Sequence, residues 1–146
     1  MKVIEKGSWQ FPSDLNVLDA VLSSYEQLNK PYIPKSAWLQ CQLALAEAFT
    51  NAVRHAHQNC PSDVTVDIEI TVFDRAVEIK IWDYGSPFDL EARVNKAADV
   101  VNDTVEGGRG LPILGQIADE LSYRRTEDNR NCLILVKHYV AEPEVG

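Results

Sequence analysis

The sequence predicts an α+β fold, a two-layer α/β sandwich in which helices cover one face of a mostly antiparallel mixed sheet. Long segments repeat apolar residues every three or four positions, which is the period of an amphipathic helix. Shorter segments alternate apolar and polar residues, which is the period of a strand with one buried face. The strand-like segments come in neighbouring pairs joined by short turns. This order favours an antiparallel sheet with helices packed against it.

The first part of the chain is expected to supply an edge strand and two helices. Residues 2–11 read as an extended strand, and the turn that follows contains Ser13, a suitable N-cap for the next helix. This first helix is expected to end near Asn29, because a proline-containing segment follows it. A second and longer helix is expected over residues 36–58.

The middle of the chain predicts a β-hairpin. Residues 64–72 alternate strictly between apolar and polar side chains, and residues 76–82 do so again, with Val77, Ile79 and Ile81 facing inward. The short turn between them contains Asp74. The expected elements after the hairpin are a turn-rich loop over 83–88, a short helix over 90–101, a glycine-rich loop over 102–110, an apolar segment over 111–118 whose first turn tolerates Pro112, and a second hairpin of 121–125 with 131–140.

The composition limits the possible classes of function. The 146 residues suffice for one domain, 1–146, with a sizeable core. A formal charge of −8 argues against nucleic acid as the main partner, because phosphate backbones demand clustered Lys and Arg. The sequence lacks both an apolar run of about 18 residues and a signal-peptide core, so we expect a cytoplasmic protein with no membrane span. The three irregularly spaced cysteines are expected to be free thiols, with Cys41 and Cys132 in the core.

Glu47 and Asn51 lie four residues apart in the predicted long helix, and His55 continues the same line. This spacing places the carboxylate and the carboxamide one turn apart on one helix face. Such an oxygen-rich edge suits a hard cation such as Mg²⁺ and suits proton transfer. The alternative is an ordinary solvated stripe on a surface helix, and this helix alone does not decide between the two.

Two further motifs are weak when they are taken singly. Asp83 follows a strand and precedes Gly85, so the pair could form a simple turn, or the carboxylate could accept a hydrogen bond from an exocyclic amine while the glycine approaches a flat ring. The glycine-rich segment of Gly107, Gly108, Arg109 and Gly110 could be a surface loop, or it could offer backbone amides to phosphate oxygens just before a helix. Its spacing matches neither a P-loop nor a dinucleotide-binding fingerprint.

Together the motifs are specific. The set E47xxxN51, D83xG85 and G108xG110 resembles the N, G1 and G2 boxes of the Bergerat-fold ATPases, which include gyrase and the histidine kinases. The segments LAEAFTNAVRHAH, IWDYGSPFD, GGRGLPIL and NCLILVKHY further resemble the bacterial anti-sigma factor serine kinases. This resemblance covers nearly the whole chain, about residues 8 to 140, and implies the histidine-kinase-like ATPase fold.

The resemblance implies a role for each box residue. Asn51 would ligate the Mg²⁺ that accompanies ATP, and Asp83 would bind the adenine amino group with Gly85 beside the ring. Glu47 would be the general base that accepts the proton of an acceptor hydroxyl. The remaining residues implied to contact the nucleotide lie in the lid over the phosphates and are Gly107, Gly108, Arg109 and Gly110.

The expected function is therefore an ATP-dependent protein serine/threonine kinase of the anti-sigma factor type. It would sequester a sigma factor or a similar regulator and would phosphorylate a small antagonist protein, and the resemblance implies a homodimer. The alternative is a catalytically silent, ATP-dependent protein-binding module. Glu47 favours the kinase, because a pure binding module has no need of a base. A clamp driven by ATP hydrolysis is disfavoured, because the sequence offers no second domain to move.

Overall fold

The computed structural model describes residues 1–57, 60, 63–85 and 110–143. The predicted helix over 90–101 and the loop residues 102–109 lie outside this described part. The elements in chain order are β1 (Val3–Pro12), a 3₁₀ turn η1 (Leu15–Val17), α1 (Leu18–Glu26), α2 (Lys35–Asn51), a π-helical turn η2 (Ala52–Ala56), β2 (Thr65–Phe73), β3 (Ala76–Asp83), α4 (Gly110–Ile117), β4 (Glu120–Arg125) and β5 (Asn131–His138).

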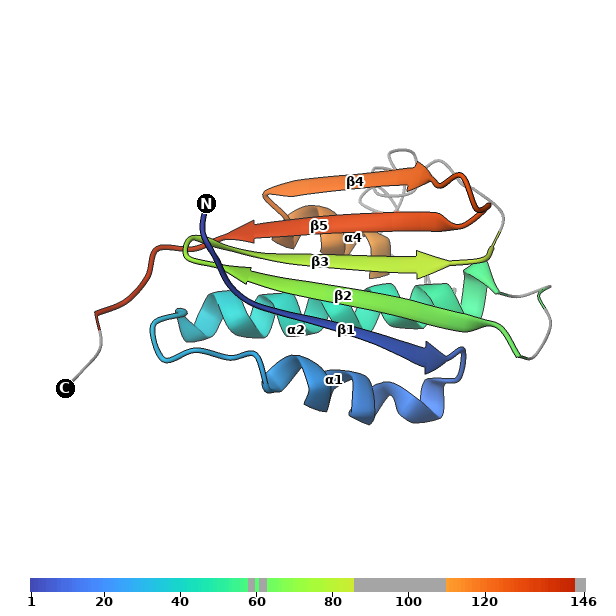
Figure 1. Cartoon of the computed structure of the whole chain (residues 1–146), viewed down its shortest axis with the longest axis horizontal. Helices are drawn as coiled ribbons and strands as arrows, with labels where there is room; N and C mark the ends of the chain where they lie inside the picture. The colour runs from blue at the N-terminus through green and yellow to red at the C-terminus, as the bar shows by residue number, and fades with distance from the viewer. Residues whose placement is uncertain (58–59, 61–62, 86–109, 144–146) are drawn as a thin grey trace.

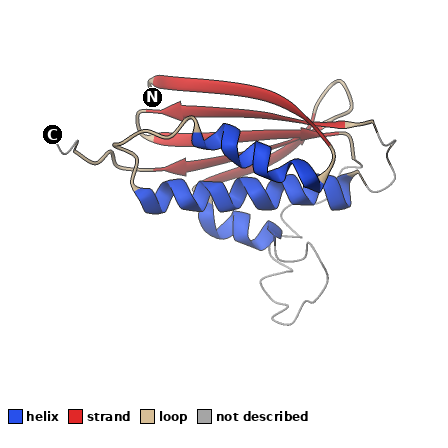
Figure 2. Ribbon diagram, turned by 90° about the horizontal axis from the view of Figure 1, so that it is seen from below, coloured by secondary structure: helices blue, strands red, loops and turns tan. Residues whose placement is uncertain are grey.

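The strands form one five-stranded sheet in the order β1-β2-β3-β5-β4. Each recorded pairing within the described residues is antiparallel. Figure 1 shows β1 and β4 at the two edges, and Figure 2 shows the helices gathered on one face of the sheet. The predicted α+β architecture, with two layers and an N-terminal edge strand, is confirmed.

The core lies between the sheet and the helices. Alternate residues of β2, β3 and β5 are buried, because a strand presents every second side chain to the same face. The main inward-facing side chains are Val66, Ile68, Ile70, Val72, Val77, Ile79, Ile81, Leu133 and Leu135. From the helices, Tyr25 stacks on Trp38 with ring centroids 4.0 Å apart, and its hydroxyl donates to the Trp38 carbonyl at 2.7 Å.

Cys41 is buried among these residues, as predicted. Burial raises the pKa of its thiol to about 12, because a thiolate would be poorly solvated in this apolar surrounding. Cys132 is buried as well, on β5. Both thiols are therefore held in their neutral form by the fold.

The structure corrects several details of the first two helices. Ser13 is not the N-cap: Asp14 takes that place, and its side chain accepts from the amide of Asn16 at 2.9 Å. The first helix begins as a 3₁₀ turn, and the second begins at Lys35 directly after a proline. Leu43, assigned to the apolar face, is 45% exposed.

The second helix also ends differently from the prediction. Regular α-helix stops at Asn51, and the following five residues form the π-helical turn η2. The backbone amide of His57 closes this turn on the Ala52 carbonyl at 3.0 Å. Such turns are rare and concentrate at functional sites. None of the helices in the described part of the chain is long and apolar enough to cross a membrane.

Candidate functional site

Asp83 ends β3 at the point where the sheet meets the end of α2. Its carboxylate is almost completely buried, with the residue 5% exposed. Within the described part of the chain, Oδ1 accepts from the backbone amide of Gly85 at 2.9 Å and from Nδ2 of Asn131 at 2.8 Å. These bonds leave Oδ2 as the oxygen available to a ligand. The predicted adenine-binding residue is thus fixed in orientation by its own turn and by the neighbouring strand.

Asn131 and Arg125 were not identified from the sequence, yet they hold this turn. Asn131 is completely buried and donates a second hydrogen bond, from Nδ2 to the Gly85 carbonyl at 2.7 Å. Arg125 donates from one guanidinium nitrogen to the same carbonyl at 2.9 Å and to Oδ1 of Asn131 at 3.0 Å. The turn from Asp83 to Gly85 is therefore clamped by β4 and β5. Asn131 lies in the segment NCLILVKHY, and that inclusion was the only sequence signal for it.

Gly85 packs directly against the end of the long helix. A Cβ placed on Gly85 would lie 2.1 Å from the Ala56 carbonyl oxygen, far inside van der Waals contact. Only glycine fits here, because the obstructing atoms belong to backbone that cannot rotate away. This contact brings the D83xG85 motif onto the same helical segment as Glu47 and Asn51, as the resemblance requires.

Asn51 is the last residue of α2 and is 6% exposed. Its side-chain oxygen is buried and has no hydrogen-bond partner. A buried carboxamide oxygen without a partner costs free energy, and a cation or its bound water would relieve that cost. Glu47 lies one turn earlier and is half-buried. The described residues contain no cluster of three or more His, Cys, Asp or Glu, so a metal here would need ligands from elsewhere, such as phosphate oxygens.

The lid glycines are only partly visible. Gly107, Gly108 and Arg109 lie outside the described residues. Gly110 is the first residue of α4, and α4 packs along α2. The glycine-rich segment therefore leads into a helix that lies against the helix carrying Asn51, which is where a lid over the phosphates is needed.

His57 joins three separate segments behind the Asp83 turn. The imidazole is 7% exposed, with Nδ1 2.7 Å from the Ser13 hydroxyl and Nε2 2.9 Å from the Tyr84 backbone amide. Burial lowers the pKa of His57, and the nearby Asp83 carboxylate opposes that shift. The sequence interpretation considered His55 on the helix face; the side chain of His55 lies outside the described residues.

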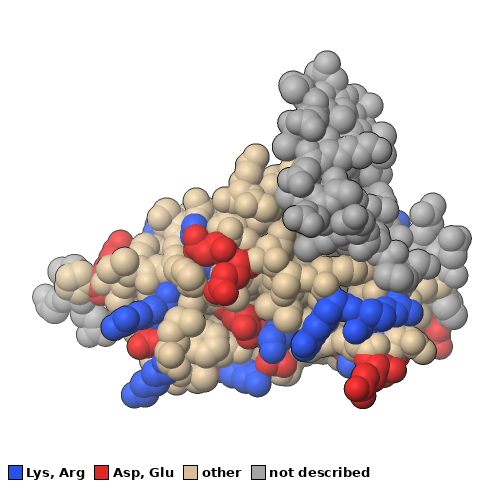
Figure 3. Space-filling model, turned by 90° about the horizontal axis from the view of Figure 1, so that it is seen from above, with Lys and Arg blue, Asp and Glu red and all other residues tan. Residues whose placement is uncertain are grey.

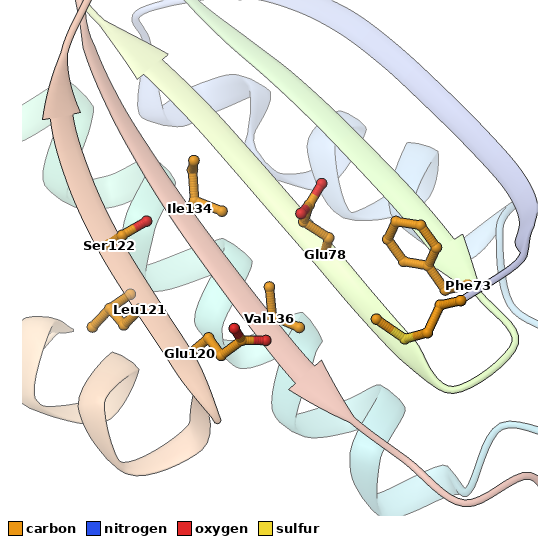
Figure 4. A pocket seen from close by; sticks show the side chains of 8 residues that line it. Phe73, Glu78, Glu120, Leu121, Ser122, Ile134 and Val136 are labelled. Atoms are coloured by element: carbon orange, nitrogen blue, oxygen red, sulfur yellow. The ribbon is translucent and has the colours of Figure 1, made fainter.

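The surface hollows of the described chain lie on the open face of the sheet, away from the predicted residues. One of about 490 Å³ is bordered by Glu78, Ile134 and Val136, as Figure 4 shows, and another of about 460 Å³ is bordered by Trp82 and Arg130. Figure 3 views the side of β4 and shows acidic and basic side chains interspersed there. Neither hollow contains a member of the three boxes.

Comparison with known proteins agrees with this geometry. The family model described as histidine kinase-like ATPase domain matches residues 11–137. Serine-protein kinase RsbW of Oceanobacillus iheyensis is 30% identical over 109 residues, which are 71% of this chain and 66% of that relative. Serine-protein kinase RsbW of Listeria monocytogenes serovar 1/2a is 28% identical over 71% of this chain and 67% of its own length. That of Bacillus licheniformis is 31% identical over 55% and 53%.

The match therefore spans slightly less than two thirds of the first of these relatives. The three motifs, the one-sided packing of helices on an antiparallel sheet and the family match all point to the same group. The resemblance to the anti-sigma factor serine kinases is confirmed at the level of the family. The chain belongs to the histidine kinase-like ATPase domain family.

Proposed function

We propose that the protein binds ATP with Mg²⁺ and transfers the γ-phosphoryl group to a serine or threonine hydroxyl of a small antagonist protein. The observation that supports this most strongly is the buried, doubly bonded carboxylate of Asp83 beside a glycine that admits no side chain. Several relatives carry the name serine-protein kinase. Phosphoryl transfer needs positioning and electrostatics more than covalent chemistry, so a small domain with few functional residues suffices.

Asp83 would accept a hydrogen bond from the adenine amino group through its Oδ2. The carboxylate is preorganised, because Asn131 and the Gly85 amide already fix its other oxygen. A fixed acceptor loses little entropy when the ligand arrives. Gly107, Gly108, Arg109 and Gly110 would contact the phosphates through backbone amides and the guanidinium group.

Asn51 would supply one oxygen ligand to Mg²⁺, and its buried, unpartnered Oδ1 fits that role. The metal, when bound with ATP, would neutralise part of the phosphate charge. Glu47 would accept the proton of the acceptor hydroxyl as that oxygen attacks the γ-phosphorus and ADP leaves. A half-buried position one turn from Asn51 places Glu47 at the edge of the site, where a protein substrate could reach it.

The remaining parts of the proposal concern partners. The protein would sequester a sigma factor or a similar regulator, and phosphorylation of the antagonist would stop the antagonist from releasing that regulator. A homodimer and a cytoplasmic location complete this proposal. The formal charge of −8 and the mixed charges visible in Figure 3 fit protein partners better than nucleic acid.

The decisive experiment is calorimetric titration of the protein with ATP and ADP, with and without Mg²⁺, followed by a transfer assay with Glu47→Gln. We expect adenine-specific, Mg²⁺-assisted binding that survives in the variant, and transfer that falls by about 10²–10⁴-fold. The exposed Glu127→Gln serves as the matched control and should transfer normally. Loss of less than about tenfold in Glu47→Gln would place the base elsewhere, and absence of ATP binding would overturn the site.

A further inference from the structure

We propose that His57, held as a neutral imidazole protonated on Nδ1, is a positioning residue for the turn from Asp83 to Gly85, and that its protonation weakens nucleotide binding. The inference rests on the proposed nucleotide site. It concerns a residue outside the three motifs, and it predicts a dependence on pH that those motifs alone do not.

The hydrogen bonds of the ring decide its protonation state. The Tyr84 backbone amide can only donate, so the Nε2 atom 2.9 Å away must carry a lone pair. In the neutral ring the proton then sits on Nδ1 and is donated to the Ser13 hydroxyl at 2.7 Å. A second proton would have to bind Nε2, where it would face the N–H group of Tyr84. The bond to Tyr84 therefore exists only while His57 is neutral.

This bond acts on the predicted adenine site because Tyr84 lies between its two members. Asp83 is fixed from one side by Asn131, and Gly85 is fixed by Arg125 and Asn131. The backbone between them is held from the helix side by His57. Loss of that restraint would free the middle of the turn and would disturb the orientation of the Asp83 carboxylate. The Gly85 contact with Ala56 makes the turn sensitive to small shifts, since no free space separates the two segments.

The surroundings of the ring favour its neutral form. His57 is 7% exposed, and desolvation lowers its pKa, while the Asp83 carboxylate on β3 raises it by a smaller amount. The other groups around it are uncharged in this range: the Ser13 hydroxyl, the tilted Tyr84 ring 6.3 Å away, and the Cys60 thiol that approaches the Tyr84 carbonyl. Because the folded pKa lies below the unfolded value, the restraint is complete above that unfolded value and is lost as the pH falls through the folded pKa.

The test compares nucleotide affinity at about pH 7.5 and about pH 5.5 in the full chain and in His57→Gln. A glutamine can accept from the Tyr84 amide and donate to the Ser13 hydroxyl, but it does not titrate. ATP phosphates also change protonation in this range, and the ratio of the two proteins' affinities at each pH removes that common effect. We expect the affinity of the natural protein to fall about threefold or more relative to that of His57→Gln.

His138→Gln is the matched control, because His138 is an exposed histidine at the end of β5. This variant should follow the pH profile of the natural protein. Identical pH profiles for the natural protein and His57→Gln would overturn the inference. Absence of ATP binding at about pH 7.5 would instead overturn the proposed function and, with it, the effect of pH on binding.

A second measurement needs neither a variant nor a nucleotide. Nitrogen-15 NMR of the imidazole rings distinguishes a protonated nitrogen from an unprotonated one. We expect His57 in the natural protein at neutral pH to carry its proton on Nδ1 and to have a bare Nε2. A proton on Nε2 would contradict the assigned hydrogen bonds and would overturn the inference even if His57→Gln failed to fold.

Discussion

The side-chain amide of Asn131 and the carboxylate of Asp83 meet across the pairing of β3 with β5, with Nδ2 2.8 Å from Oδ1. Both residues are buried, and they lie directly opposite each other in the strand register. The bond directs one carboxylate oxygen toward the sheet and leaves the other for a ligand. Asn131 also holds the Gly85 carbonyl, so one side chain on β5 fixes both members of the predicted adenine-binding motif.

Replacing Asn131 with alanine should weaken both the fold and the site. The change removes a donor from the Gly85 carbonyl and from Asp83, and buried groups that lose a partner typically cost about 1–3 kcal/mol. We expect the free energy of unfolding, measured by urea denaturation, to fall by about that amount, and ATP affinity to fall as well. The exposed Asn16→Ala is the control and should change stability by less than about 0.5 kcal/mol.

Asp83→Asn should remove nucleotide binding while preserving the fold. The asparagine oxygen can still accept from Gly85 and Asn131, so the clamp survives. Its amide nitrogen cannot accept from an amino group, and losing a hydrogen bond to a charged acceptor costs about 1.5–3 kcal/mol. Calorimetry should show ATP affinity reduced by about tenfold or more, whereas the exposed Asp19→Asn should bind as the natural protein does. Native affinity in Asp83→Asn would exclude this residue as the adenine contact.

Gly85→Ala should disrupt the contact between the turn and the long helix. The new methyl group would lie 2.1 Å from the Ala56 carbonyl oxygen, and the turn must move to relieve the overlap. Overpacking of this kind usually costs about 1–3 kcal/mol, and we expect a lower melting temperature together with weaker ATP binding. The control Gly115→Ala changes an exposed glycine in α4 and should be neutral or stabilising, because alanine favours helix.

The three thiols should react at very different rates. Burial raises the pKa of Cys41 to about 12 and also raises that of Cys132, so neither presents a thiolate to a reagent at neutral pH. Cys60 is only half-buried. A disulfide reagent should therefore label one thiol quickly in the native protein and the other two only after unfolding. Rapid labelling that persists in Cys60→Ser would show that the core is open on this timescale.

The sequence predicted the layers well because periodicity reports burial directly. The alternation in residues 76–82 placed Val77, Ile79 and Ile81 on the inner face, where the structure has them. Asn131 escaped prediction because its role depends on the register of β5 against β3, and a single strand does not reveal its partner's register. The assignments of Glu47, Asn51 and the lid residues to nucleotide roles stay predictions.

His57 escaped prediction for a different reason. Its importance comes from Ser13 and Tyr84, which are 44 and 27 residues away along the chain. The same distance effect explains why Ser13 was misassigned: a serine before a helix is a common cap, but here tertiary contact claims its hydroxyl for His57 and Asp14 supplies the cap instead.

The π-helical turn over Ala52–Ala56 has a consequence for how this helix can be altered. A π turn holds one residue more than an α turn, so it behaves as a single-residue insertion accommodated without breaking the helix. Deleting one residue between Asn51 and His57 would let the segment relax to regular α-helix and would rotate everything after the deletion by about 100° around the axis. The imidazole would then leave Ser13 and Tyr84 while Asn51 kept its place. A redesigned helix must therefore conserve this residue count, even though most of the side chains in the turn are small.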